Sequence, residues 1–254
     1  MNGTTNWARA FLCAVLVACI GAAVSARTYW AYYDCASGVA TVIVLANASE
    51  FAMEDAATVR LYDVNGSLIH ESVHGLTAYE STAIFLNGLL EETNESTWGL
   101  AEIDSQLLLQ VGVWIGTEGN WLFVENYGDL LGSGGNLSID TYWYGLNYAN
   151  TQNRRTTVTI LNPSDRLVLG ALYMYDAYGV LQYRQNFRLS ARQPTYIDLE
   201  IVAEIGDDAW GLLDVEAEQP VLLVCSYYDA DGYLIDVDVV DQPYYLEFAE
   251  EEEE

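Results

Sequence analysis

The sequence predicts an all-β protein made of two tandem antiparallel β-sandwich domains with about seven strands each. The first observation behind this prediction is a turn pattern, Tyr-Asp-x-x-Gly, at residues 62–66 that recurs at 175–179 and again at 228–232. An Asp at the first position and a Gly at the fourth favour a type I turn closed by a left-handed Gly, which is a common hairpin connection. The second observation is a duplication of the whole chain, and the third is strand-like alternation within each copy.

The duplication extends well beyond the hairpins, because short blocks of the first half recur in the second half in the same order. We therefore expect a first repeat over residues 27–136, a second repeat over 137–246, and a disordered acidic tail over 247–254. The matching blocks are 28–30 with 141–143, 41–45 with 157–161, 76–86 with 189–199, 98–100 with 210–212, and 114–122 with 227–235.

Within each repeat the apolar residues alternate along short runs that are bounded by turn signals. Thr157, Thr159 and Leu161 fall on one face of such a run, while Val158 and Ile160 fall on the other. The chain also contains 19 Tyr and 7 Trp, an enrichment that suits β-sheet. Immunoglobulin-like sandwiches share this pattern of short alternating strands.

The N-terminus has the features of a secretory signal peptide over residues 1–26. Arg9 precedes an apolar run at 11–20, and small residues then lead to a cleavage site before Arg27. The run is too short to span a bilayer, and no other run is long enough. We expect a secreted, periplasmic or cell-surface protein. The alternative is a lipoprotein, because residues 16–19 also fit a lipobox that would place a lipid on Cys19.

Net charge limits the partners of this protein. The chain has 37 acidic against 9 basic residues, for a formal net charge of -28. Nucleic acid is disfavoured because phosphate binding needs a basic surface, and an anionic membrane is disfavoured for the same reason. A solvated acidic surface explains the charge most simply, while a cationic partner or a divalent ion remains open.

After removal of the signal peptide two cysteines remain, Cys35 and Cys225. In an exported protein they could form a disulfide that ties the start of the first repeat to the end of the second. Two buried thiols are the equal alternative.

The sharpest catalytic motif is His70-Glu71-Ser72-Val73-His74, which matches the H-E-x-x-H zinc-peptidase pattern. The duplication argues against it, because His70 aligns with Tyr183 and His74 with Phe187 on a strand with period-two alternation. Residues four apart on a strand are separated by roughly 13 Å and cannot share one zinc. We expect a strand and no catalysis, with the zinc metallopeptidase as an alternative.

A second metal motif lies in the third hairpin. Asp229 and Asp231 precede Gly232, and Asp236 follows, in a pattern like part of a calcium loop. The pattern departs from an EF-hand, and a solvated hairpin explains it better. No cofactor is expected, with a calcium ion at these residues as the alternative.

Aromatic residues without a counterpart in the other repeat are the candidates for ligand binding. Flat rings can stack on sugars, although aromatic residues on strands more often serve packing. The chain shows no credible Ser/His/Asp set and no phosphate-binding Gly loop. The candidate binding residues are Trp114, Trp121, Tyr144, Tyr148, Tyr228 and Tyr233.

Several short motifs resemble those of a known family. They are Arg-Thr-Tyr-Trp at 27–30, Leu-Asn-Pro-Ser-Asp at 161–165, the Tyr-Asp-x-x-Gly hairpin, and the segments 189–195 and 219–224. Through them each half is similar to the small β-sandwich domain of the sensory rhodopsin transducer family and to modules of secreted bacterial proteins. The resemblance implies a non-enzymatic, often oligomeric module that binds sugars or other small ligands. The present chain differs in being duplicated and carrying a signal peptide, so a cytoplasmic transducer role is not expected.

Taken together, these features predict a secreted non-catalytic protein that binds a ligand outside the cell or at its surface. A glycan is the first expected ligand, and a cell-surface protein is the alternative. A structural role in the envelope or in adhesion, with self-assembly into a homo-oligomer, is the second expected function.

Overall fold

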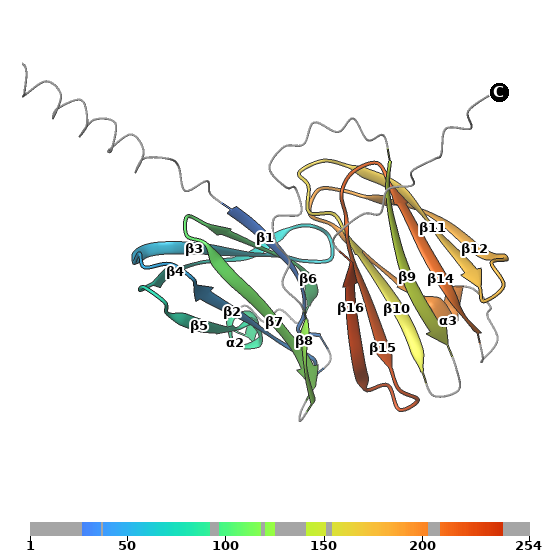
Figure 1. Ribbon diagram of the computed structural model, residues 1–254, viewed down its shortest axis with the longest axis horizontal. Helices are drawn as coiled ribbons and strands as arrows, with labels where there is room; N and C mark the ends of the chain where they lie inside the picture. Colours follow the sequence, from blue (N-terminus) through green and yellow to red (C-terminus); the bar gives the residue numbers. More distant parts are fainter. Residues whose placement is uncertain are drawn as a thin grey trace, which may run out of the picture.

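The computed structural model describes residues 27–36, 38–91, 97–117, 120–124, 141–150, 154–202 and 209–240. These residues form an almost entirely β structure of antiparallel strands, which confirms the predicted fold class (Figure 1). The expected signal peptide with its Cys19 alternative, residues 125–140 around the boundary of the two repeats, and the acidic tail lie outside the described residues.

The first half contains eight strands and one short helix. They are β1 (Arg27–Asp34), β2 (Ala40–Asn47), β3 (Met53–Tyr62), β4 (Leu68–Leu76), β5 (Ser81–Phe85), α2 (Leu86–Glu91), β6 (Trp98–Ser105), β7 (Leu109–Thr117) and β8 (Asn120–Val124).

The second half repeats this order. Its elements are β9 (Tyr142–Asn150), β10 (Arg155–Leu161), β11 (Val168–Asp176), β12 (Leu181–Leu189), β13 (Pro194–Asp198), α3 (Leu199–Val202), β14 (Ala209–Ala217), β15 (Leu222–Tyr228) and β16 (Leu234–Val240). None of the helices in the described part of the chain is long and apolar enough to cross a membrane.

Each half folds into two four-stranded sheets that pack face to face. In the first half, sheet I has the order β1-β6-β3-β4 and sheet II the order β5-β2-β7-β8. In the second half, sheet III has the order β9-β14-β11-β12 and sheet IV the order β13-β10-β15-β16. The orders correspond strand for strand, so sheet I is the counterpart of sheet III and sheet II that of sheet IV.

This strand order differs from that of an immunoglobulin constant domain in its first strand, so the likeness to immunoglobulin-like sandwiches stays a prediction. In an immunoglobulin constant domain the first two strands share one sheet and the last two share the other. Here the last two strands, β7 and β8, do share a sheet, but β1 and β2 lie in different sheets because β1 pairs with β6. The described part of each half also has eight strands, one more than expected. Alternation along a strand identifies its buried face, but it does not say which strands pair.

The two hairpins that lead the repeat form as predicted. Gly66 donates its backbone N–H to Asp63 O at 2.9 Å, and Gly179 donates to Asp176 O at the same distance. Both glycines have φ 78°, in the left-handed region that glycine tolerates best. The Asp63 carboxylate accepts the backbone N–H groups of Asn65 and Ser67, which holds the turn closed.

The structure corrects part of the sequence alignment between the repeats. Leu109 N donates to the Tyr29 hydroxyl, and Val221 N donates to the Tyr144 hydroxyl in the same place. Tyr29 therefore corresponds to Tyr144, and strand pairing likewise matches Val42 with Thr157 and Trp114 with Ser226. The block matches of 28–30 with 141–143, of 41–45 with 157–161 and of 114–122 with 227–235 are out of register by one or two residues. The physical reason is that strands are rich in the same few residue types, so neighbouring registers give similar sequence matches.

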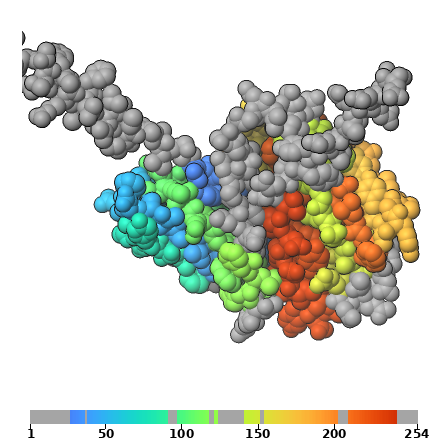
Figure 2. All heavy atoms as spheres, viewed as in Figure 1, coloured from blue at the N-terminus to red at the C-terminus, as the bar shows by residue number. Residues whose placement is uncertain are grey.

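The two halves pack against each other through the outer faces of sheet I and sheet IV. Leu161, Leu222 and Val224 point outward from sheet IV, yet they have no exposed surface because they join the hydrophobic cluster of the first half. Figure 2 shows the first half, coloured blue to green, in contact with the red strands β15 and β16 of the second half. The contact creates a junction that neither half has alone.

Candidate functional site

A cleft with a volume of about 210 Å³ lies where sheet I meets sheet IV, and we call it the interdomain cleft. Four aromatic rings line it: Tyr32 and Trp98 from the first half, and Tyr196 and Tyr228 from the second. Ligand sites often lie at such domain junctions, because rings and polar groups from two rigid scaffolds converge there.

Strand register explains why these rings converge. Tyr32 on β1 lies opposite Leu100 on β6, and Trp98 begins β6 opposite Asp34. The Trp98 ring lies between two tyrosine rings, with its centroid 6.4 Å from Tyr32 and 6.1 Å from Tyr196. The interplanar angles of 54° and 58° are those of tilted pairs, which aromatic rings favour over flat stacking.

The polar side of the cleft centres on Asp34. Its carboxyl group accepts hydrogen bonds from Ala36 N at 2.8 Å and from the Tyr32 hydroxyl at 3.3 Å. Burial raises the pKa of Asp34, although these two hydrogen bonds oppose the shift. The hydroxyl-bearing side chains of Thr157, Thr159 and Ser226 complete the polar lining.

The tyrosines of the cleft remain protonated at neutral pH. Burial raises the pKa of Tyr228 to about 12, and the neighbouring Tyr196 and Asp34 add to the effect. Burial, followed by the charge of Asp34, also raises the pKa of Tyr32 well above its usual value. The cleft therefore offers phenol hydroxyls as donors, a carboxyl group as an acceptor and aromatic ring faces for apolar contact.

Arg192 holds the two halves together beside the cleft. It lies in the turn between β12 and β13 with φ 59°, and its guanidinium is 2.9 Å from the Glu102 carboxylate on β6. The guanidinium also lies 4.4 Å from the ring centroid of Trp30 and 5.8 Å from that of Tyr62. This combination of an ion pair with two cation–π contacts is worth more when desolvated, as it is here.

Two of the predicted binding residues lie elsewhere, on the outer face of sheet II. Trp114 on β7 and Trp121 on β8 are both exposed there, together with Phe123 and Phe85. The rings of Trp114 and Phe123 are 5.0 Å apart. We call these four residues the aromatic face, and they do not reach the interdomain cleft.

The remaining predicted binding residues have different locations. Tyr228 lines the interdomain cleft, as a binding residue should. Tyr233 is exposed beside the β15–β16 turn. Tyr144 and Tyr148 are buried inside the second sandwich, where Val221 N donates to the Tyr144 hydroxyl. The prediction that these two bind a ligand is wrong, because they point into the core.

Asp229, Asp231 and Asp236, the alternative calcium site, do not come together as a set of metal ligands. The Asp229 carboxylate accepts the backbone N–H groups of Asp231 and Tyr233 and so closes its own turn. Asp236 lies on β16, opposite Tyr227. Within the described ranges no three metal-ligating side chains come together.

Of the two alternatives for Cys35 and Cys225, the structure shows two buried thiols and no disulfide. Cys35 is buried in the hydrophobic cluster of the first half and Cys225 in that of the second, so the two thiols lie in different cores. Burial raises the pKa of each thiol to about 12, which keeps both protonated at neutral pH.

The H-E-x-x-H motif lies on strand β4, as the duplication predicted. His70 and His74 pair in register with Leu61 and Ala57 on β3, so they are separated by roughly 13 Å along the strand. The imidazole of His74 lies 2.9 Å from the Ser72 hydroxyl. Burial, then the proximity of His70, lowers the pKa of His74. This geometry does not allow the two histidines to share one zinc ion.

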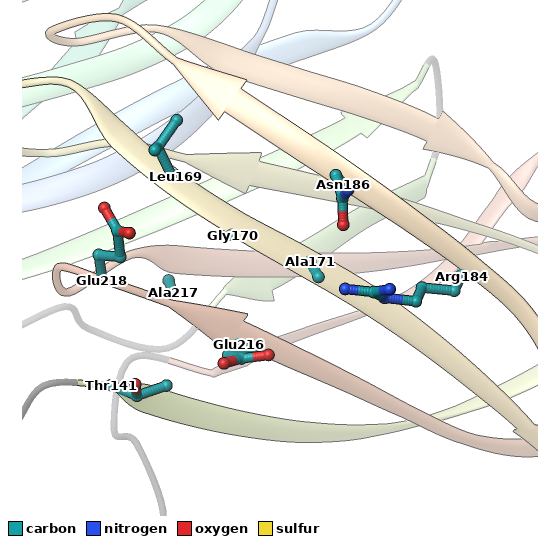
Figure 3. Close-up of a pocket in the computed structure, with 9 residues that line it drawn as sticks. All are labelled: Thr141, Leu169, Gly170, Ala171, Arg184, Asn186, Glu216, Ala217 and Glu218. Carbon is teal, nitrogen blue, oxygen red and sulfur yellow. The ribbon is translucent and has the colours of Figure 1, made fainter.

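A second hollow, of about 290 Å³, lies on the outer face of sheet III (Figure 3). Arg184 and Glu216 flank it, and Glu218 and Asn186 complete its polar rim. Because no aromatic ring lines it, this hollow offers less apolar contact to a small ligand than the interdomain cleft does.

Tyr32, Asp34 and Tyr196 are not among the binding residues predicted from the sequence, and Trp98 is not among them because Trp210 is its counterpart in the other repeat. The available signal was an acidic residue next to a run of aromatic residues at 29–34. That signal does not identify a cleft, because half of the lining comes from the other repeat.

No protein-family model matches the chain, and a search of curated proteins found no match. Three solved structures align with it at low similarity. A glycosyl hydrolase family 2 member from Bacteroides cellulosilyticus is 10% identical, with 84% of this chain and 28% of that chain covered and a TM-score of 0.18. A putative β-galactosidase from Bacteroides fragilis is 15% identical, with 85% of this chain and 32% of that chain covered and a TM-score of 0.19. An exo-chitosanase from Amycolatopsis orientalis is 11% identical, with 84% of this chain and 25% of that chain covered and a TM-score of 0.19.

The aligned region spans about a third or less of each of these longer chains. TM-scores this low support no argument about fold or function. The class of the protein follows from its own structure, which is a tandem β-sandwich with an aromatic cleft at the domain junction.

Proposed function

We propose that this chain is an exported, non-catalytic binding protein that holds a carbohydrate in the interdomain cleft. The observation that carries the proposal is the convergence of four aromatic rings, one carboxyl group and three Ser or Thr hydroxyl groups at one junction. A sugar ring has an apolar C–H face that stacks on aromatic rings and hydroxyl groups at its edge that need hydrogen bonds. The cleft supplies both kinds of contact.

We propose a non-catalytic role because of the residues that line the cleft. Most glycoside hydrolases use two carboxyl groups on either side of the bond that is cleaved. Among the described residues that line the cleft, Asp34 alone carries a carboxyl group. The proposed site therefore has binding contacts without the second catalytic group.

Glycan-array screening followed by calorimetry tests this proposal. We expect Tyr196→Ala to weaken binding of the best glycan at least tenfold, which corresponds to about 1.4 kcal/mol. Tyr196 is 45% exposed, so its truncation should leave the fold intact. Trp114→Ala is the matched control, because it removes a partly exposed ring from the aromatic face and should not change affinity.

Two outcomes of these experiments would contradict the proposal. Wild-type protein that binds no glycan would refute it. Binding that survives Tyr196→Ala and disappears in Trp114→Ala would move the site to the aromatic face.

An organic cation is a second candidate ligand, favoured by the net charge of -28 and by Asp34 beside the rings. Quaternary ammonium groups bind in aromatic cages through cation–π attraction. Titration with choline separates the two ligands, because cation binding should weaken with added salt and on Asp34→Asn. Binding of a neutral glycan should not depend on salt.

A further inference from the structure

Among the described residues, the contact between the two halves leaves the outer face of one sheet in each half uncovered. Sheet IV of the second half packs on sheet I of the first. Sheet II is the counterpart of sheet IV, and sheet III is the counterpart of sheet I. Sheet II thus corresponds to the sheet that packs on the other half, and we call its outer face the packing face. Sheet III corresponds to the sheet that is covered, and we call its outer face the receiving face. Within the described part of the chain, neither face has the partner that its counterpart has.

Residues on the outer face of sheet III are exposed, whereas their counterparts on the outer face of sheet I are buried or half-buried. Leu100 points outward from β6 but is 0% exposed, because the second half covers it. Its counterpart Leu212 on β14 is 42% exposed. Trp98 is half-buried in the junction, and its counterpart Trp210 is 61% exposed.

The outer faces of sheet IV and sheet II show the same contrast between a buried and an exposed counterpart. Ser226 on β15 lies opposite Thr157 and is 6% exposed in the junction. The counterpart of Ser226 is Trp114, which lies opposite Val42 on β2 and is 39% exposed. The rest of the aromatic face extends this surface with Phe85, Phe123 and Trp121. A contiguous apolar surface of this kind is unusual on a monomer and marks an interaction site.

The turn that carries Arg192 also has a counterpart in the first half. Arg192 has φ 59°, and Tyr79 in the turn between β4 and β5 has φ 58°, so the two turns share an unusual backbone conformation. Arg192 inserts between Trp30, Tyr62 and Glu102 of the first half. Tyr79 is 72% exposed at the end of sheet II that bears the β4–β5 turn, and Arg192 lies at the corresponding end of sheet IV.

We propose that copies of this protein associate head to tail, with sheet II of one copy packed on sheet III of the next. This contact repeats, between copies, the packing of sheet IV on sheet I within each chain. In it, Trp114 and the aromatic face would cover Leu212 and Trp210, and Tyr79 would occupy the place of Arg192 beside Tyr175. Because the two faces differ, the association is heterologous and gives a filament or a closed ring.

Net charge opposes this association and makes it depend on salt. Each copy carries a formal charge of -28, so copies repel one another at low ionic strength. Added salt screens the repulsion, while the apolar contact itself does not need salt. Assembly should therefore increase with salt concentration, whereas assembly through ion pairs would decrease.

Light scattering coupled to size exclusion tests the proposal with two charge variants. Trp114→Glu disables the packing face, and Leu212→Glu disables the receiving face. We expect wild type to form larger species as protein and salt concentrations rise, and each variant alone to remain monomeric. An equimolar mixture of the two variants should form a heterodimer that grows no further, because only one pair of competent faces remains.

Val73→Glu is the matched control. It places the same charge on an exposed apolar position of β4 in sheet I, outside both proposed faces, and should assemble like wild type. Wild type that stays monomeric at every concentration and salt level would overturn the proposal, as would a variant mixture that gives no heterodimer. These outcomes are independent of ligand binding in the interdomain cleft, because the variants leave Tyr196 and Asp34 unchanged.

Discussion

At the scale of single residues, equal sequence positions in the two repeats have unequal environments. Trp98 is the first residue of β6 and Trp210 the second residue of β14, and both precede a Gly-Leu pair. Trp98 packs between two tyrosine rings in the interdomain cleft, while Trp210 is exposed. The side chain is the same, so the difference comes entirely from what covers it.

Buried thiols give a pH dependence at this scale. The pKa of Cys225 is raised by burial to about 12, well above the value near 9 of an unfolded thiol. The resulting stability is fully present below the unfolded pKa and is lost as pH rises from there towards about 12. We expect the free energy of unfolding, measured with urea at a series of pH values, to fall above about pH 9.

Cys225→Ala provides the control for the thiol contribution. It removes the titrating group, so the decline of stability between about pH 9 and 12 should become shallower, even though the variant is less stable at neutral pH. An unchanged slope would show that other groups, such as Tyr228 with its pKa of about 12, cause the decline.

At the scale of elements, the two repeated hairpins share one turn geometry but differ in their contacts with the other half of the chain. Both turns close with a Gly at φ 78° and an Asp carboxylate that accepts two backbone N–H groups. A Cβ atom on Gly179 would meet nothing within 4 Å, whereas one on Gly66 would lie 2.4 Å from Ala191 O of the other half.

The two glycines form a matched pair for mutation. Gly179→Ala should cost about 1 kcal/mol, since only the left-handed backbone conformation is penalised. Gly66→Ala should cost more, because the added methyl group also pushes the β3–β4 hairpin away from the second half. Urea unfolding of both variants checks this, and equal losses would contradict the close contact between the hairpin and Ala191.

At the scale of the whole molecule, the two sandwiches act as one unit because Arg192 joins them. Arg192→Met should lower the free energy of unfolding by about 2 kcal/mol, since it leaves Glu102 buried with one cationic partner fewer. The loss is limited because Arg60 still contacts the Glu102 carboxylate at 2.8 Å. Arg188→Met, on the exposed side of β12, is the control and should change stability little. Equal stability of both variants would contradict this role of Arg192.

The sequence by itself determined the class of fold, the hairpins and the duplication. Turn chemistry and period-two alternation are local properties, so Asp63, Gly66 and the face of β4 that carries His70 could be predicted correctly. Strands are rich in the same few residue types, which allowed a slip between Tyr29 and Tyr142, because neighbouring registers give similar matches.

Only the tertiary structure decided the strand order, the separation of Cys35 from Cys225 and the location of the candidate site. The interdomain cleft takes Tyr32 from one repeat and Tyr196 from the other, and it exists only because sheet IV covers sheet I. Burial by a neighbouring domain is a property of the assembled surface, and the sequence of one strand does not record it. For the same reason Tyr144 and Trp114 look alike as aromatic residues on strands, although one is in the core and the other is exposed.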